Sequence, residues 1–150
     1  MHFSTIYLLK DEELDDLSLS DIEEDFCERF CYCCGETRPR YQYWCDWFQI
    51  GGRWNEMFKA VRGFEAQRSL FTVGEPKLEN HFAVVEIKDL QEPIDKENVY
   101  AIATRSRIYT HNDYWGGTES NVNESKFNEL LDKINNKKIK GVIAWIDCHD

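Results

Sequence analysis

Five of the six cysteines lie within a short segment, and this cluster constrains the fold more than any other feature of the sequence. Its members are Cys27, Cys31, Cys33, Cys34 and Cys45. The run from Cys31 to Gly35 has a C-x-x-C-G spacing, in which two thiolates can reach one metal ion across a tight turn that glycine permits. Cys27 and Cys31 are four residues apart and would share one helix face. The cluster therefore predicts a loop closed by a metal ion.

Zinc fits this cluster because it prefers four tetrahedral ligands, and thiolates are its usual structural ligands. The candidate ligands of a structural Zn²⁺ are Cys27, Cys31, Cys34 and Cys45. Cys33 could replace Cys31 or Cys34, and Cys148 or His149 could replace Cys27 or Cys45 if the chain ends pack together. A group of buried free cysteines is the simpler alternative. A redox pair at Cys33 and Cys34 is not favoured, because no βαβ pattern surrounds it.

The first residues bear on how the cysteines are used. Residues 1–5 have no basic region, long apolar core or small-residue cleavage site, so we expect no secretion signal. Without export, metal binding or reduced thiols are expected in preference to a disulfide framework. No apolar run reaches the roughly 20 residues that a membrane helix needs. We therefore expect a protein of the cytoplasm, with no membrane partner.

Acidic residues are concentrated in one segment. The chain has 28 acidic and 18 basic residues, a net charge of −10, and residues 11–28 contain ten acids and no base. The rest of the chain has as many acids as bases, so this segment accounts for the whole net charge. Such a charge disfavours direct binding to nucleic acid and favours a basic protein surface as partner. A purely solubilising run that also favours a helix start is the alternative.

A helix is predicted to begin near Asp21. Ser20 and Glu23 fit a capping box, and Ile22, Phe26 and Phe30 would form one apolar stripe. Gly35 and Pro39 are expected to end the helix. The candidate partner-binding residues on it are Asp21, Glu23, Glu24, Asp25 and Glu28.

The rest of the chain predicts a single α+β domain over residues 1–150. Strands are expected at His2–Leu9, His81–Ile87, Val99–Thr104 (which Arg107–Thr110 could extend) and Val142–Asp147. Helices are expected from Trp54 to Val61, and from Asn123 through Phe127, Leu130, Leu131 and Ile134 until Gly141. The aromatic Gly-Gly block, Trp44–Trp54, is expected to be a loop. The order of elements predicts a mostly antiparallel sheet covered by helices on one face, with the acidic helix and zinc-stapled loop at about residues 11–45.

The last predicted strand ends in Asp147-Cys148-His149. Strand alternation places Asp147 and His149 on one face with Trp145, and Cys148 on the other. Cys148 and His149 are therefore poorly placed as a nucleophile and base. Asp147 could orient His149, and a small hydrolase that uses both with Arg53 is one alternative function. A polar end to a structural strand is favoured over it, so we expect no catalytic residues and no enzyme.

Three segments carry a resemblance to known proteins. They are the nine-residue block Asp46–Trp54 (D-W-F-Q-I-G-G-R-W), the loop around Trp115-Gly116-Gly117 and the terminal Asp147-Cys148-His149. Together they resemble a group of uncharacterised phage and mobile-element proteins with a D-W-Y-x-x-G-G-R-W motif and a terminal D-C-H. Phe48 replaces the usual tyrosine. The cysteine cluster and acidic segment have no counterpart in that pattern.

A phage-type origin, which the resemblance implies, favours one functional class. Small acidic proteins of mobile elements often antagonise host defence, and some anti-CRISPR proteins block the basic channels of RNA-guided nucleases. This chain is similar to them in size, charge and implied origin. The sequence therefore predicts a zinc-containing inhibitor that acts in the bacterial host cell on a nucleic-acid enzyme, with a CRISPR effector nuclease as the expected target. The alternatives are the small hydrolase and a phage structural protein.

Overall fold

The computed structural model describes residues 2–14, 21–32, 44–52, 84–111 and 120–149. Several predictions lie outside these residues: the capping serine, Cys33, Cys34, Gly35, Pro39, Arg53, the helix from Trp54 to Val61 and the loop around Trp115. No helix of the described part is long and apolar enough to cross a membrane.

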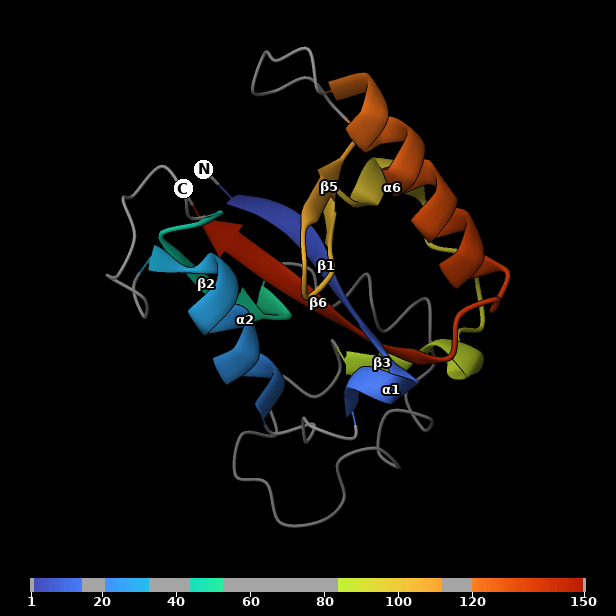
Figure 1. Cartoon of the computed structure of the whole chain (residues 1–150), viewed down its shortest axis with the longest axis horizontal. Coiled ribbons are helices and arrows are strands. Elements are labelled where there is room, and N and C mark those ends of the chain that lie inside the picture. The colour runs from blue at the N-terminus through green and yellow to red at the C-terminus, as the bar shows by residue number, and fades with distance from the viewer. Residues whose placement is uncertain (1, 15–20, 33–43, 53–83, 112–119, 150) are drawn as a thin grey trace.

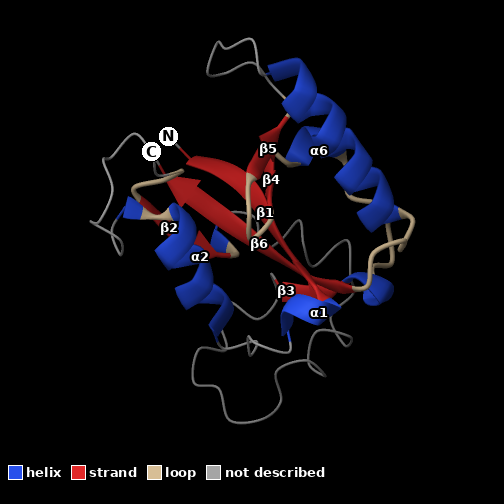
Figure 2. Cartoon of the chain, in the orientation of Figure 1, coloured by secondary structure: helices blue, strands red, loops and turns tan. Residues whose placement is uncertain are grey.

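The described chain forms one six-stranded sheet built around β6 (Gly141–His149) (Figure 2). β1 (His2–Lys10) pairs antiparallel with β6 along its whole length, from His2 opposite His149 to Lys10 opposite Gly141. β2 (Trp47–Ile50) and β3 (Val84–Glu86) pair with the other edge of β6. β4 (Ala101–Ala103) runs parallel to β1, and β5 (Ile108–Thr110) runs antiparallel to β4. The predicted α+β class and mostly antiparallel sheet are confirmed.

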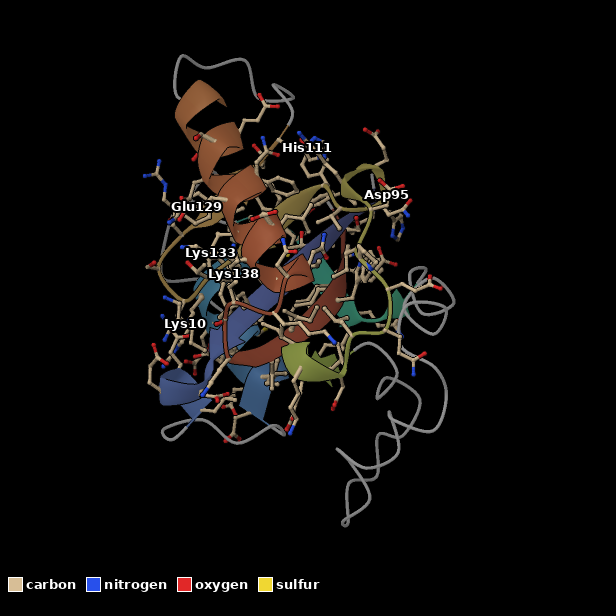
Figure 3. The ribbon with its side chains drawn as sticks, turned by 90° about the vertical axis from the view of Figure 1, so that its right-hand side faces the viewer. Lys10, Asp95, His111, Glu129, Lys133 and Lys138 are labelled. Carbon is tan, nitrogen blue, oxygen red and sulfur yellow. The ribbon has the colours of Figure 1, made fainter. Side chains whose placement is uncertain are left out.

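The helices lie on both faces of the sheet. α2 (Ile22–Phe30) packs on the face that carries Tyr7, where the Phe26 ring lies 5.2 Å from the Tyr7 ring. α6 (Ser120–Asn135) lies beside β4 and β5 on the opposite face (Figure 3). The Phe127 ring of α6 lies 4.8 Å from the ring of His111. Figure 1 shows α2 and α6 on either side of β1 and β6. The prediction that helices cover only one face of the sheet is therefore wrong, because β1 and β6 bury side chains on both faces of the sheet.

The core follows from this three-layer arrangement. On the β1 strand, Ile6, Tyr7 and Leu8 are all buried, so both faces of the strand are covered. On α2 the predicted stripe is confirmed, with Ile22 and Phe26 buried and Phe30 packed against the core. On α6 the predicted apolar side chains Phe127, Leu130, Leu131 and Ile134 are buried as well.

Five element boundaries differ from the prediction. α2 ends at Phe30, before Gly35, because the backbone of Cys31 is already extended. The block expected to be a loop contains strand β2, and residues 108–110 form a separate strand, β5, that turns back on β4. α6 begins at Ser120, before Asn123. Gly141 begins β6 and does not end α6; a Cβ there would lie 2.2 Å from the Leu9 carbonyl oxygen, so the β1–β6 pairing requires glycine.

Shorter elements complete the described chain. α1 (Asp11–Leu14) follows β1 directly, and two 3₁₀ turns, η5 (Ile87–Asp89) and η6 (Lys96–Asn98), lie between β3 and β4. The Asp95 side chain accepts a hydrogen bond from the Glu97 backbone and so caps η6.

Candidate functional site

The predicted acidic surface lies on α2, but its carboxylates do not all face solvent. Glu24 and Glu28 are exposed and one helical turn apart, whereas Asp21 and Glu23 are partly buried. Asp25 is only 8% exposed. The prediction that Asp25 belongs to the partner-binding surface is therefore corrected, because its place one turn after Ile22 puts it on the buried stripe.

Asp25 is the centre of a buried polar network. Its Oδ2 accepts a short hydrogen bond from the Tyr7 hydroxyl, and its Oδ1 accepts from Arg29 Nε at 3.0 Å and from Arg105 Nη2 at 3.4 Å. Arg29 Nη1 also donates to the Arg105 carbonyl at 3.0 Å. The network ties α2 to β1 and to the turn between β4 and β5. Sequence analysis missed Tyr7, Arg29 and Arg105, although Arg29 stands four residues after Asp25.

Two pKa shifts reflect this network. Burial raises the pKa of Tyr7 far above its usual range, and the hydrogen bond to Asp25 and its negative charge raise it further. Burial lowers the pKa of Arg29, but the hydrogen bond to Asp25 and its charge outweigh burial, and the pKa of Arg29 is raised overall. Tyr7 therefore stays neutral and donates a hydrogen bond to Asp25, while Arg29 stays charged.

Two of the predicted zinc ligands are brought together beyond the end of α2. Cys31 and Cys45 face each other in an isolated parallel bridge, and both are fully buried. Cys31 Sγ lies 3.2 Å from the Asp46 carbonyl oxygen and Cys45 Sγ lies 3.9 Å from that of Phe30. Backbone bonds from Tyr32 to Cys45 and from Trp44 to Phe30 hold the segments in register.

The other predicted zinc ligands do not join Cys31 and Cys45 in the described structure. Cys27 precedes Cys31 by one helical turn and is disulfide-bonded, with a partner outside the described residues. Cys34 and its replacement Cys33 also lie outside them. Among residues that the structure describes, no three His, Cys, Asp or Glu side chains converge as metal ligands. Of the other proposed replacements, Cys148 is buried next to Thr5 and His149 lies on the opposite face of β6.

A second group of polar side chains lies where β1, β6 and β2 meet, close to both chain ends (Figure 1). Strand register places His2, His149 and Trp47 side by side. His149 stacks on Trp47 with ring centroids 5.2 Å apart and planes 13° apart. The ring of His2 meets both edge-on, at 5.0 Å from His149 and 5.5 Å from Trp47. We call these three rings together with Asp147 the histidine cluster.

Asp147 is the buried member of the histidine cluster. It is 2% exposed, and its Oδ1 lies 2.9 Å from His2 Nδ1. Asp147 and His149 share one face of β6, as strand alternation predicts. However, Asp147 orients the imidazole of His2 and not that of His149. No local pattern in the sequence predicts this pairing, because the two residues are 145 positions apart.

The Gly-Gly turn after β2 covers Asp147. Gly51 donates to the Trp145 carbonyl at 2.7 Å, and both Gly51 and Gly52 have positive φ. A Cβ at Gly52 would lie 2.5 Å from the Cβ of Asp147. Glycine therefore allows the turn to approach the carboxylate and keep water from it. The same cluster leaves His149 Nδ1 buried without a hydrogen bond to the described residues.

A groove of about 330 Å³ lies at the other end of β6, beside α1. Its charged lining comprises Asp11, Glu86, Lys88, Lys137 and Lys140. Glu86 and Lys88 form an ion pair at 2.9 Å. The mixture of signs gives this groove no clear preference for an anionic or a cationic ligand.

Comparison with known proteins finds no relative: no family, no curated protein and no solved structure matches the chain.

Proposed function

We propose that this chain is a binding protein that uses the exposed acids of α2 to dock on a basic surface of a nucleic-acid enzyme. The observation that carries the proposal is the division of acids on α2. Asp25 is directed inward and neutralised by two arginines, whereas Glu24 and Glu28 remain exposed. Two exposed carboxylates one helical turn apart give this side of α2 a negative charge, which a basic partner surface would complement.

The Asp25 network makes α2 a firm support for such a surface. Phe26 packs on Tyr7 and on Phe48, at ring distances of 5.2 and 4.8 Å, and Asp25 links the helix to β1 and to Arg105. A helix that is ordered before binding loses little conformational entropy when a partner docks. The acids can therefore be presented in a fixed geometry to a basic surface.

The proposed target is an RNA-guided DNA nuclease of the bacterial host cell. Such enzymes hold their heteroduplex in a positively charged channel, which complements an acidic helix. Binding there would block nucleic acid, as an anti-CRISPR protein of mobile-element origin would. The inhibitor proposal requires no catalytic residue.

Cleavage by purified RNA-guided nucleases tests this proposal. The chain should inhibit cleavage by a susceptible nuclease, and the double variant Glu24→Lys, Glu28→Lys should lose most of that inhibition. The matched control is Glu129→Lys, because Glu129 is an exposed acid on α6, on the opposite face of the sheet. Equal inhibition by the wild type and the double variant would contradict the proposal.

We further propose that the cysteine cluster binds one structural Zn²⁺ when its thiols are reduced. Cys31 and Cys45 already face each other, while Cys27 must leave its disulfide before it can act as a thiolate ligand. Elemental analysis of reduced protein after extensive dialysis should find about one tightly bound zinc per chain, lost in Cys45→Ser and retained in Cys148→Ser. Cys148 is an equally buried control thiol. Absence of zinc from reduced wild type would contradict this proposal.

A further inference from the structure

The two imidazoles of the histidine cluster have a ring spacing that suits two ligands of one metal ion. His2 and His149 are cross-strand neighbours at one end of the β1–β6 pair, and their ring centroids are 5.0 Å apart. Two imidazoles that bind one ion through Nε2 at about 2.0–2.1 Å, at a near-tetrahedral angle, have centroids roughly 5 Å apart. The observed spacing therefore matches that of two ligands of one ion.

Asp147 supplies the outer interaction that histidine ligands usually need. Its Oδ1 accepts from His2 Nδ1 at 2.9 Å, which fixes the tautomer with a proton on Nδ1 and leaves the lone pair of Nε2 for an ion. Asp147 is 2% exposed and lies beneath Gly52, so its charge is little screened by water. A buried carboxylate behind the imidazole increases its basicity and favours a cation in front of it.

Ring packing, and not a hydrogen bond through Nδ1, positions the His149 side chain. Its ring stacks on Trp47, and its Nδ1 is buried without a partner among the described residues. Trp47 is itself 41% exposed, so the cluster is open to solvent on one side. This arrangement leaves Nε2 of His149 as the nitrogen through which an ion could be bound.

We infer that His2 and His149 bind a divalent transition metal ion, with Asp147 as the positioning residue of His2. Imidazole nitrogen suits Zn²⁺, Cu²⁺ and Ni²⁺. Since no third His, Cys, Asp or Glu of the described residues converges with these rings, water completes the coordination. The inference is independent of the inhibitor proposal and of the cysteine zinc site, which lies on the other side of the sheet's end, beyond α2.

Titration of untagged protein with Ni²⁺ tests this site, with calorimetry and tryptophan fluorescence as two readouts. The wild type should bind one Ni²⁺ and its fluorescence should be quenched, because Trp47 stacks on a ligand. His149→Phe keeps a ring against Trp47 and should raise the dissociation constant at least tenfold. Asp147→Asn should raise it about 10-fold to 100-fold, as loss of an outer-shell partner does.

Two further variants separate this site from its alternatives. Trp47→Phe should retain Ni²⁺ binding by calorimetry and lose most of the quenching. Cys45→Ser should leave the Ni²⁺ affinity of the site unchanged. Binding that survives in folded His149→Phe, or that disappears in Cys45→Ser, would overturn the inference, as would wild type that binds no Ni²⁺ at millimolar concentration.

Discussion

Two buried aspartates on opposite faces of one sheet are used differently. Asp25 is 8% exposed and accepts hydrogen bonds from Tyr7, Arg29 and Arg105. Asp147 is 2% exposed and accepts from His2, beside a second imidazole whose buried Nδ1 has no hydrogen-bond partner among the described residues. The first carboxylate is balanced by two permanent charges, as expected of a structural anchor. The second lies against imidazoles, which are the commonest metal ligands in proteins, as expected of a binding site.

The two carboxylates also differ in the backbone that surrounds them. The Asp25 network lies under an ordinary helix and needs no unusual backbone. Asp147 lies beneath a turn in which two successive glycines have positive φ, at 82° and 50°. Glycine adopts positive φ without strain, so the turn can approach Asp147 more closely than residues with a Cβ would allow.

Removal of the Asp25 carboxylate should have the largest effect on stability. Asp25→Ala leaves two guanidinium groups and the buried Tyr7 hydroxyl without their acceptor, and we expect a loss of about 3 kcal/mol. The partial exposure of both arginines keeps the loss from being larger. Chemical denaturation measures it, with Glu24→Ala as the exposed control on the same helix. A loss below about 1 kcal/mol would show that Asp25 does not anchor α2.

A methyl group over Asp147 should have the next largest effect. Gly52→Ala places a Cβ 2.5 Å from the Cβ of Asp147 at a φ of +50°, and we expect a loss of about 2 kcal/mol from crowding and backbone strain. Gln49→Ala, at an exposed position in the adjoining strand, is the control and should change stability by less than about 0.5 kcal/mol. Wild-type stability in Gly52→Ala would mean that the turn does not press on the carboxylate.

The Asp25 side of the comparison also predicts alkaline sensitivity. The pKa of Tyr7 is raised in the folded state, so the stability that the Tyr7 hydroxyl contributes is complete below the unfolded pKa of about 10. This stability is lost as the pH rises above that value. The unfolded state then releases a proton that the folded state retains, at a cost of about 1.4 kcal/mol per pH unit. Denaturation at pH 9, 10 and 11 should show this decline in wild type and a weaker one in Tyr7→Phe. Identical slopes would contradict the network's assignment to Tyr7.

Long periodic elements could be predicted from the sequence because their signals are local. β1, α2, β6 and the apolar side of α6 follow from alternation or helical spacing within single segments. β2 could not be predicted, since its four residues become a strand only by pairing with β6, about a hundred residues later. The turn that separates β5 from β4 was missed for a similar reason: two short strands resemble one interrupted strand.

The sites were predicted less completely than the fold. The exposed acids of α2 and the shared face of Asp147 and His149 follow from periodicity. The burial of Asp25 could have been found from the same helical stripe, since it follows Ile22 by three residues. The role of His2 could not, because it depends on the register between the first and last strands.

The central claim is that the exposed acids of α2, and not its buried one, bind a basic partner. Association with a nuclease that the chain inhibits should be measured at 0.1 and 1 M salt, where the Debye length falls from about 10 Å to about 3 Å. The account predicts fast association of wild type that slows strongly with salt, and slow association of Glu24→Lys, Glu28→Lys at both concentrations, with unfolding free energy unchanged within about 0.5 kcal/mol. Equal, salt-independent association of both proteins would contradict the claim.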